Sequence, residues 1–344
     1  MHRGHLDVIM RAKKENDECY VIVCGFDGEP RAAEIGMNLK ERTAAVRRVF
    51  ANDEIIKVIS INDTELGIDE SMSLSNWVIW QSKVKGMIPI TSEDKATWYV
   101  AEPFYRDMLT KTNVIKANVV LVDKALDISG TKIRQNPLKY WNFINKEFRK
   151  NLCHNILITG TASEGKTTLV RDIARYFGIE HSEEFGRWDM LEKGKSDTDL
   201  TAEDFMDFLI GQSKDMESKI KNNKDGVFIS DTDNLVTLMY AKAYADDPNI
   251  QVTHEQYDFK IDMLARMLMH RVRWNKIFLL PPKNEFVDDG TRYMKQASID
   301  ERIANFDKLV RLLKQYDLYD KVTILDRDYL GNFEIVKDYI NTLF

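Results

Sequence analysis

The stretch ILITGTASEGKTTLVRDIARYFG, residues 156–178, holds a short apolar run, a glycine-containing turn and an amphipathic helical pattern in that order. Its centre, Gly160 to Thr167, reads G-T-A-S-E-G-K-T and matches the complete pattern of a phosphate-binding P-loop. The apolar residues before it predict a strand, and Leu169, Ile173 and Phe177 recur on one face of the helix expected after it. Strand, turn and helix is the setting in which this pattern holds phosphate, so we expect the chain to bind a nucleoside triphosphate.

The residues of this loop predict separate contacts with ATP and Mg²⁺, the two cofactors we expect. Lys166 would reach the β- and γ-phosphates, and the Thr167 hydroxyl would ligate the ion. The remaining contacts would come from backbone N–H groups and from a second hydroxyl at the helix start. The residues expected at ATP are therefore Gly160, Ser163, Gly165, Lys166, Thr167 and Thr168.

Composition narrows the class of protein. A length of 344 residues suggests two domains, and 44% hydrophobic with 30% charged residues is an ordinary composition for a soluble protein. The net charge of −6 argues against a broad nucleic-acid-binding surface. The three cysteines show no metal-ligand or disulfide pattern, and no apolar stretch is long enough to cross a bilayer. With no signal peptide at Met1, we expect a cytoplasmic protein that neither enters membranes nor binds nucleic acid; the sequence leaves homo-oligomers open.

Two series of strand-like runs alternate with helical patterns along the chain. Such alternation predicts parallel sheets covered on both faces, so the fold class we expect is α/β, with two tandem doubly wound domains. The predicted domains are residues 1–145, Rossmann-like, and residues 146–344, which contain the P-loop. The expected strands are 20–24, 55–61, 98–100 and 119–122 in the first domain and 156–159, 227–230, 277–280 and 322–325 in the second, with helices at 38–50 and 72–85. Trp141, Phe143 and Phe148 lie in the connector and are expected to pack one domain on the other.

Asp231-Thr232-Asp233 follows the apolar run 227–230. An acidic residue at the carboxyl end of a parallel strand faces the ligand crevice of such sheets. Asp231 is therefore expected to be catalytic, either holding Mg²⁺ or taking the proton from an acceptor hydroxyl. Asp233 would contact the substrate or, alternatively, cap the next helix.

The segment after residues 277–280 resembles the mobile lid of nucleoside and nucleotide kinases. It leaves the sheet at Pro281-Pro282, continues through Asp288-Asp289-Gly290-Thr291-Arg292 and carries Arg302 on an amphipathic helix. Phosphoryl transfer needs cations on the moving phosphate, which Arg292 and Arg302 could supply. Arg302 has the alternative of being a solvated surface charge.

The acceptor should bind after the second strand of this domain. Glu183 and Glu184 could hold ribose hydroxyls there, and Trp188 could stack on a flat, cationic base. The alternatives are a buried core position for Trp188 and a helix cap for Glu183. The residues expected at the substrate are Glu184, Arg187, Trp188, Gln212 and Asp233.

Two short motifs mark the ends of the first domain. His2-Arg3-Gly4-His5 opens the chain, and residues 128–134 read I-S-G-T-K-I-R. Together they resemble the paired signatures of small nucleotidylyltransferases, each at the start of a helix. Histidines at a helix N-terminus can hold a triphosphate and the charge that develops at its α-phosphorus. Ser129, Thr131 and Arg134 would hold the outer phosphates.

The order of the two modules resembles the NadR-type bifunctional proteins of NAD biosynthesis. That resemblance implies a nicotinamide mononucleotide adenylyltransferase followed by a ribosylnicotinamide kinase. The small-molecule substrates would be nicotinamide mononucleotide and ribosylnicotinamide. The ATP site of the adenylyltransferase would include His2, His5, Ser129, Thr131 and Arg134, with His5 catalytic; the kinase site would include Gly160 to Thr167, Asp231 and Arg292. The segment 31–42 also looks like the central loop of that family.

The sequence departs from the family at two points. Family members have a strand and a G-x-F-x-P run before the first histidine, whereas this sequence begins on the motif itself. A glycine expected near the ligand is replaced by Ala101. The missing strand would be central in a parallel sheet, and its loss would expose apolar neighbours and unpaired backbone groups. A start codon assigned too far downstream would give the same pattern.

Two alternatives to the bifunctional enzyme stay open. One is an enzyme that acts only as a kinase, with the first domain as a scaffold. The other is a regulatory ATP-binding protein that senses nucleotides and controls a transporter or transcription. Because no DNA-reading segment precedes Met1, a repressor is not expected.

Overall fold

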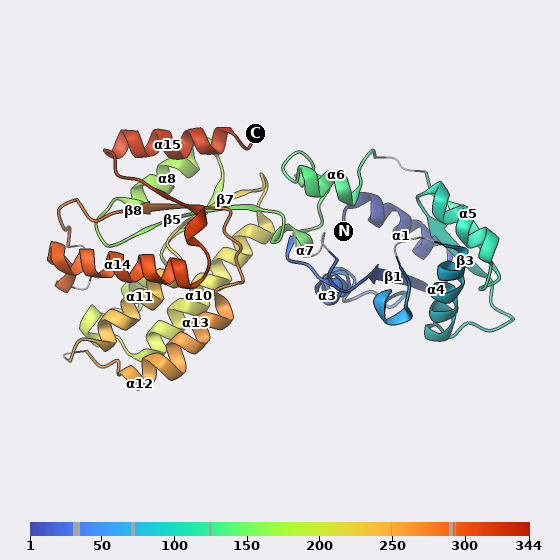
Figure 1. Cartoon of the computed structure of the whole chain (residues 1–344), viewed down its shortest axis with the longest axis horizontal. Helices are drawn as coiled ribbons and strands as arrows, with labels where there is room; N and C mark the ends of the chain where they lie inside the picture. Colours follow the sequence, from blue (N-terminus) through green and yellow to red (C-terminus); the bar gives the residue numbers. More distant parts are fainter. Residues whose placement is uncertain (30–34, 70–72, 124–125, 249, 289–291, 293) are drawn as a thin grey trace. The chain divides into compact units, whose positions relative to one another are not determined.

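The structure, a computed structural model, describes residues 1–29, 35–69, 73–123, 126–248, 250–288, 292 and 294–344. The chain folds into two compact units, Met1–Leu152 and Cys153–Phe344 (Figure 1). The first unit extends past residue 145 because the short helix α7 (Lys146–Arg149) packs on α3 (Leu39–Val49). Trp141, expected to join the two domains, is buried, with the Arg149 guanidinium 5.1 Å from its ring centroid.

The first unit alternates helices and strands, as the sequence predicts. Each expected strand is present, and its observed ends differ from the predicted ends by at most two residues. In chain order the elements are α1 (Arg3–Glu15), β1 (Cys19–Gly25), α3 (Leu39–Val49), β2 (Ile56–Asn62), η1 (Thr64–Leu66), α4 (Leu74–Met87), β3 (Ala96–Val100), α5 (Pro103–Thr112), β4 (Ala117–Leu121), α6 (Gly130–Gln135), η2 (Trp141–Phe143) and α7 (Lys146–Arg149).

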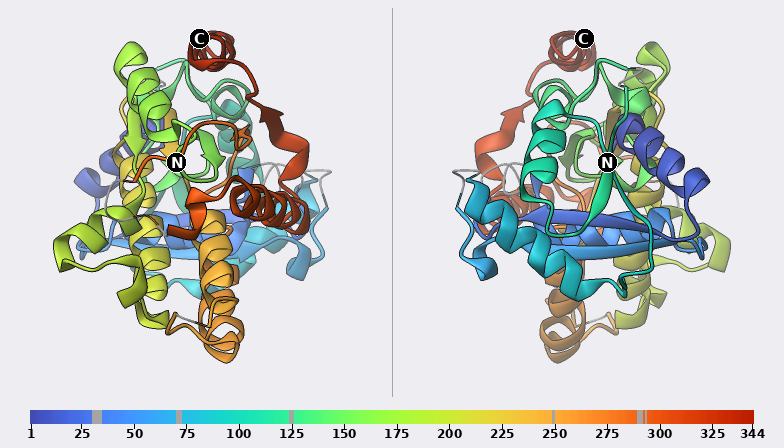
Figure 2. Two further views of the ribbon diagram at one scale, coloured as in Figure 1. Left: turned by 90° about the vertical axis from the view of Figure 1, so that its left-hand side faces the viewer. Right: turned by 90° about the vertical axis from the view of Figure 1, so that its right-hand side faces the viewer.

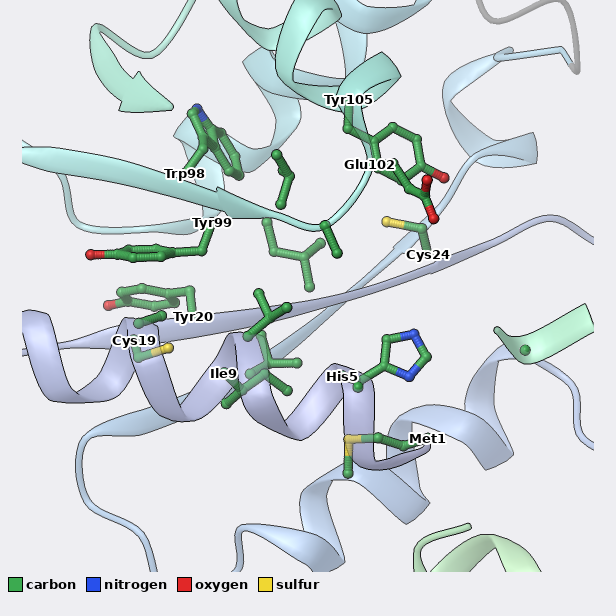
Figure 3. Close-up of a pocket in the computed structure, with 18 of the residues that line it drawn as sticks. Met1, His5, Ile9, Cys19, Tyr20, Cys24, Trp98, Tyr99, Glu102 and Tyr105 are labelled. Carbon is green, nitrogen blue, oxygen red and sulfur yellow. The ribbon is translucent and has the colours of Figure 1, made fainter. Parts of the chain in front are cut away.

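The strands of this unit form two separate parallel pairs. β1 pairs with β2, and β3 pairs with β4; among the described residues no strand joins one pair to the other. The remaining edges of β1 and β3 line a common cavity, with α1 along one side (Figure 3). An open strand edge carries unpaired N–H and C=O groups. The sheet is thus divided at a central position, as expected for a sheet that lacks a middle strand.

Helix α1 links the two pairs through side chains. It contacts both β1 and β3. At its end, the Tyr99 hydroxyl of β3 donates to Glu15 Oε2 at 2.8 Å and accepts from Asn16 Nδ2 at 2.9 Å. An apolar cluster around Ile61 and Val84 also contacts both β1 and β3, so side-chain packing rather than a backbone ladder sets their separation.

The second unit has more elements and one sheet. In chain order they are β5 (His154–Gly160), α8 (Lys166–Phe177), β6 (Glu180–Ser182), α9 (Phe185–Lys193), η3 (Asp197–Asp199), α10 (Ala202–Asn222), β7 (Val227–Asp231), α11 (Asn234–Ala245), α12 (His254–Gln256), the π-helical turn η4 (Tyr257–Asp262), α13 (Met263–Leu268), β8 (Lys276–Leu280), η5 (Met294–Ala297), α14 (Ile299–Gln315), η6 (Tyr319–Lys321), β9 (Val322–Ile324) and α15 (Tyr329–Asn341).

The five strands of the second unit form a parallel sheet in the order β6-β7-β5-β8-β9. β5 is central, and Ile156, Leu157 and Ile158 are at most 1% exposed because helices cover both faces. Helices α8 and α15 lie on one face and α10, α11 and α14 on the other (Figures 1 and 2). The doubly wound fold is confirmed. Because the chain order reverses at β5, the carboxyl ends of β5 and β7 border a ligand crevice.

The longest helix, α10, has 21 residues and carries acidic and basic side chains along its length. Nowhere in the described part of the chain is a helix both long and apolar enough to cross a membrane.

Candidate functional site

The P-loop connects β5 to α8 through a backbone that turns inward. Gly160 has φ 149°, and a Cβ there would lie 2.5 Å from the carbonyl oxygen of Leu280. Ser163 and Gly165 adopt left-handed conformations, with φ of 66° and 80°. Successive residues of this kind direct backbone N–H groups toward one point, and the first turn of α8 adds its own N–H groups. The local geometry is that of an anion-binding loop.

Thr167 and Asp231 come together beside this loop. The Thr167 hydroxyl donates to Asp231 Oδ2 at 2.5 Å, which joins the start of α8 to the end of β7. Asp231 is 1% exposed, and among the described residues its Oδ1 has no hydrogen-bond partner. Burial raises the pKa of this carboxyl above its ordinary value, although Lys166 and Thr167 oppose the shift.

This pair fits a hard divalent cation. A hydroxyl beside a buried carboxylate with one unused oxygen offers the oxygen ligands that Mg²⁺ prefers, and Mg²⁺ usually completes its shell with water and phosphate. The described residues contain no group of three His, Cys, Asp or Glu side chains that would bind a metal by themselves. Thr167 and Asp231 are therefore the residues that would hold Mg²⁺ if it bound here with a nucleotide.

A second carboxylate lies near the first. Glu184 precedes α9 at the N-cap position, just beyond β6. Burial raises the pKa of Glu184, and the neighbouring charges that act on it are Lys166, Asp231, Arg187 and Arg292. The structure thus gathers four predicted site residues around Glu184, from different elements at the carboxyl edge of the sheet.

Trp188 lies on the surface near this group. It is 54% exposed, so the alternative of a core residue is wrong. Its Nε1 donates to Glu183 Oε2 at 3.1 Å. Arg171 in turn holds Glu183 with two hydrogen bonds of 2.6 and 2.8 Å and lowers the pKa of that carboxyl to about 2. Glu183 is thereby a partner of Arg171 and Trp188 rather than a helix cap.

Gln212 and Asp233 are bound into the scaffold. Gln212 is 2% exposed; its Oε1 accepts from Phe185 N at 2.7 Å, and its Nε2 donates to Ser182 and Glu183. Asp233 accepts hydrogen bonds from Leu235 N at 3.0 Å and from Trp274 Nε1 at 3.1 Å. Burial raises the pKa of its carboxyl to about 6. Asp233 therefore has the capping role that the sequence left as its alternative. Gln212 shapes the turn that carries Glu184.

The two lid arginines take different positions. Arg292 donates from Nη1 to Ser163 Oγ and to the Val287 carbonyl, so it reaches the P-loop. Arg302 is 3% exposed, which excludes a solvated surface charge, and its Nη1 donates to Glu164 Oε1 and the Asn284 carbonyl at 2.8 Å each. Its guanidinium thus contacts a P-loop carboxylate, where the sequence predicts contact with phosphate. Asp289, Gly290 and Thr291 of the predicted lid lie outside the described residues.

Tyr240 is a site residue that the sequence does not reveal. Its side chain lies on α11, where the backbone N–H of Ala162 in the P-loop hydrogen-bonds its hydroxyl and Glu184 is a charged neighbour. Burial raises its pKa. One tyrosine within the apolar pattern of α11 carries no sequence signal, because only the fold brings it to the P-loop.

Five predicted residues of the first unit line one cavity of about 1130 Å³: His2, His5, Ser129, Thr131 and Arg134. Both motifs begin helices as predicted. His2 caps α1, with its ring centroid 3.8 Å from that of His5, and Ser129 caps α6 by accepting from Lys132 N at 3.2 Å. Figure 3 shows His5 at the start of α1, across the cavity from Cys24 and Glu102.

The predicted central loop of this unit is described only in part, because residues 31–34 lie outside the described residues. Arg42, near its end, lines the cavity and donates from Nη2 to Glu29 Oε2 at 2.7 Å and to the Cys24 carbonyl at 3.2 Å. Ala101 lines the same cavity. The cavity therefore has basic, hydroxyl and imidazole groups at one end.

Comparison with known proteins identifies both units. A sequence model described as an AAA domain matches residues 155–329, about half of the chain. The chain belongs to the AAA domain family. Residues 1–136 match a model described as cytidylyltransferase-like. Together with the whole-chain similarities reported next, this pairing makes the chain a NadR-type protein, as its motifs predict.

Whole-chain relatives agree with the domain matches. The chain is 26% identical over 355 residues to the trifunctional NAD biosynthesis/regulator protein NadR of Salmonella typhimurium strain LT2, covering 98% of this chain and 80% of that protein. It is 25% identical over 350 residues to the Escherichia coli K12 protein of the same name, covering 97% and 78%. A crystal structure of NadR protein in complex with NR is similar with a TM-score of 0.80, 29% identity and coverage of 99% and 92%. A second, in complex with NAD and AMP-PNP, gives a TM-score of 0.78, 28% identity and coverage of 100% and 92%.

The backbone at Thr232 is strained, and this leads to a stability prediction. Thr232 has φ 73° and is 1% exposed, and within the described parts of the chain its Oγ1 has no hydrogen-bond partner. A left-handed conformation costs a residue with a Cβ about 1–2 kcal/mol, a cost that glycine avoids. We expect the free energy of unfolding of Thr232→Gly, measured by urea denaturation, to be about 1 kcal/mol higher than that of Thr232→Ala. Equal stabilities of the two variants would show that the surroundings impose no strain at this position.

Proposed function

We propose that the second unit transfers the γ-phosphate of ATP to the 5′-hydroxyl of ribosylnicotinamide, which yields nicotinamide mononucleotide and ADP. The observation that carries the proposal is the hydrogen-bonded pair of Thr167 and Asp231 beside Lys166, with Glu184 nearby. A P-loop that only senses nucleotide does not need a second carboxylate at the acceptor side. Similarity over nearly the whole chain to a NadR protein in complex with NR supports this choice of acceptor.

The reaction forms one bond and breaks one. The ribose 5′-oxygen attacks the γ-phosphorus, the bond from that phosphorus to the β–γ bridging oxygen breaks, and ADP leaves. Mg²⁺ bound with the nucleotide would neutralise charge on the β- and γ-phosphates. Lys166 and Arg292 would stabilise the charge of the transferring group.

The hydroxyl proton needs a carboxylate as its acceptor. Asp231 has one oxygen on Thr167 and another available for the ion, so Glu184 is the carboxylate left for the proton. Its raised pKa suits that task, because a more basic carboxylate accepts a proton more readily. Arg187 would keep the Glu184 carboxylate near the acceptor, and Trp188 would stack on the nicotinamide ring.

For the first unit we propose adenylyl transfer from ATP to nicotinamide mononucleotide. An oxygen of its phosphate attacks the α-phosphorus of ATP, the α–β bridging bond breaks, and pyrophosphate leaves as NAD forms. The specific observation is that the two helix-start motifs, far apart in sequence, line one cavity. His2 and His5 would stabilise charge at the α-phosphorus, and Ser129, Thr131 and Arg134 would hold the departing phosphates.

Both activities use small metabolites, and we place the protein in the cytoplasm, where its free cysteines stay reduced.

Two outcomes would point to the alternatives. Phosphorylation without NAD formation, even after a strand and a G-x-F-x-P turn are added ahead of His2, would make the first unit a scaffold. Tight ATP binding with neither reaction would make the protein a nucleotide sensor.

Replacement of Lys166 tests the kinase. Lys166→Ala should lower kcat for ribosylnicotinamide phosphorylation by about 10²–10³-fold, because it removes a contact to the transferring phosphate. Asp231→Asn should also abolish turnover, and circular dichroism should show both variants folded. ADP release in a coupled assay is the measurement. Near-wild-type activity of Lys166→Ala would remove the P-loop from the reaction.

Trp188 tests the acceptor site. Trp188→Ala should weaken ribosylnicotinamide binding by about 0.5–2 kcal/mol through loss of a cation–π contact. ATP affinity should stay unchanged, since the indole is exposed and contributes little to the core. Calorimetric titration with each ligand separates the two effects. An equal loss for both ligands would contradict a stacking role.

The divided sheet of the first unit tests the adenylyltransferase. The 344-residue chain should form little NAD from nicotinamide mononucleotide and ATP, because among the described residues no strand holds β1 and β3 together, and each lost phosphate donor costs about 2.7–4 kcal/mol of barrier. Adding a strand and a G-x-F-x-P turn ahead of His2 should raise NAD synthesis, and His5→Ala in that longer protein should remove it, as followed by chromatography. Fast NAD formation by the 344-residue chain would show that the divided sheet suffices.

A further inference from the structure

Glu164 and Arg302 form an ion pair inside the second unit. Arg302 Nη1 lies 2.8 Å from Glu164 Oε1, and the two side chains are 4% and 1% exposed. Glu164 belongs to the P-loop and lies between Ser163 and Gly165. Arg302 lies in the first turn of α14. Among the described residues, Arg302 Nε has no hydrogen-bond partner, so the charge of this buried pair is compensated through Nη1. Removing one member of such a pair leaves an uncompensated buried charge.

The loop after β8 completes this arrangement. Glu164 Oε2 accepts from the backbone N–H groups of Lys283 at 3.1 Å and Asn284 at 3.2 Å. The Asn284 carbonyl accepts from Arg302 Nη1 at 2.8 Å. Glu164, Arg302 and the backbone of Lys283 and Asn284 therefore close a ring of hydrogen bonds, which we call the Glu164–Arg302 brace.

The brace acts on the part of the P-loop that is hardest to form. Ser163 and Gly165, on either side of Glu164, are both left-handed, and Ser163 has a Cβ that makes this conformation unfavourable. A fixed Glu164 side chain prevents the loop from relaxing away from that shape. Replacing a buried pair by apolar residues often costs no stability, so the stability of the fold does not by itself explain the Glu164–Arg302 pair.

We propose that Glu164 and Arg302 are positioning residues that hold the P-loop in its phosphate-binding conformation. This proposal rests on the proposed kinase function only for its catalytic readout. Arg302 then acts through Glu164 and touches neither substrate nor nucleotide. The competing hypothesis is the one from sequence, in which Arg302 contacts the transferring phosphate.

The two hypotheses predict different effects on nucleotide binding. If the brace prepares the loop, only the fraction of molecules with a formed loop binds, and the apparent Kd rises by the inverse of that fraction. Glu164→Gln and Arg302→Met should each raise the Kd for ADP with Mg²⁺ by about tenfold or more. The double variant should bind no worse than either single variant, because the two residues act as one unit.

The experiment uses the full chain and calorimetric titration with ADP and MgCl₂. A matched control is Asp204→Asn, since Asp204 is also a buried acid, 5% exposed and paired with Lys195 at 2.6 Å, but it caps α10. The control should lower the melting temperature without changing the Kd. If a single variant does not fold, the double variant, which leaves no lone buried charge, still tests the proposal against wild type.

Kinase assays add the second readout. The brace variants should raise the KM for ATP together with the Kd, while kcat at saturating ATP stays within about threefold of wild type. Loss of kcat in Arg302→Met, with an unchanged Kd and a normal Glu164→Gln, would overturn the proposal in favour of phosphate contact. An unchanged Kd in the double variant would overturn it too. A wild-type protein that does not phosphorylate ribosylnicotinamide would contradict the proposed function, whereas the ADP titration would still decide on the brace.

Discussion

The hydrogen bond between Thr167 and Asp231 joins the two strands on which the second unit depends. It ties the start of α8, which follows the central strand β5, to the end of the neighbouring strand β7. Every other group of the kinase site is placed relative to this pair: Lys166 by the same helix, Glu184 by the next strand, and Arg292 by the loop after β8. A parallel sheet brings these chain segments together because all its strands end at one edge.

The first unit also brings distant chain segments together at one site, but without a continuous sheet. Its two motifs each start a helix, and the helices converge on one cavity although the strands form separate pairs. Phosphate-binding groups at helix starts need only correct helix placement, which α1 and α6 provide. What a continuous sheet would add is a fixed distance between the two halves of the cavity.

Local signals in the sequence predicted much of this fold. Apolar runs predicted the strands, and Asn38 caps α3 at the start of the helix expected at residues 38–50. The three-residue strand β6 was not predicted as a distinct run, because Glu180 and His181 are polar and an edge strand needs little apolar surface. The P-loop, Asp231 and the two motifs of the first unit were found because their chemistry is encoded in adjacent residues.

The remaining site residues depend on contacts between distant segments. Tyr240 and Glu164 have no local signature, since only tertiary packing brings the first to Ala162 and the second to Arg302. For the same reason, sequence alone left the role of Asp233 open and assigned Gln212 to the substrate. Whether a polar side chain faces a ligand or the scaffold is decided by partners such as Trp274 and Phe185.

The divided sheet also affects how the two units unfold. In the second unit a continuous ladder of backbone hydrogen bonds runs through five strands, so local opening of one strand disturbs its neighbours. In the first unit, among the described residues, the ladder stops between β1 and β3, and cooperativity passes through side chains: those of α1 and those of the apolar cluster around Ile61 and Val84. Regions with fewer shared hydrogen bonds open at lower free energy. Amide protons along the cavity edges of β1 and β3 consequently exchange with solvent through small local fluctuations. The amide protons of β5 exchange only when the whole sheet unfolds.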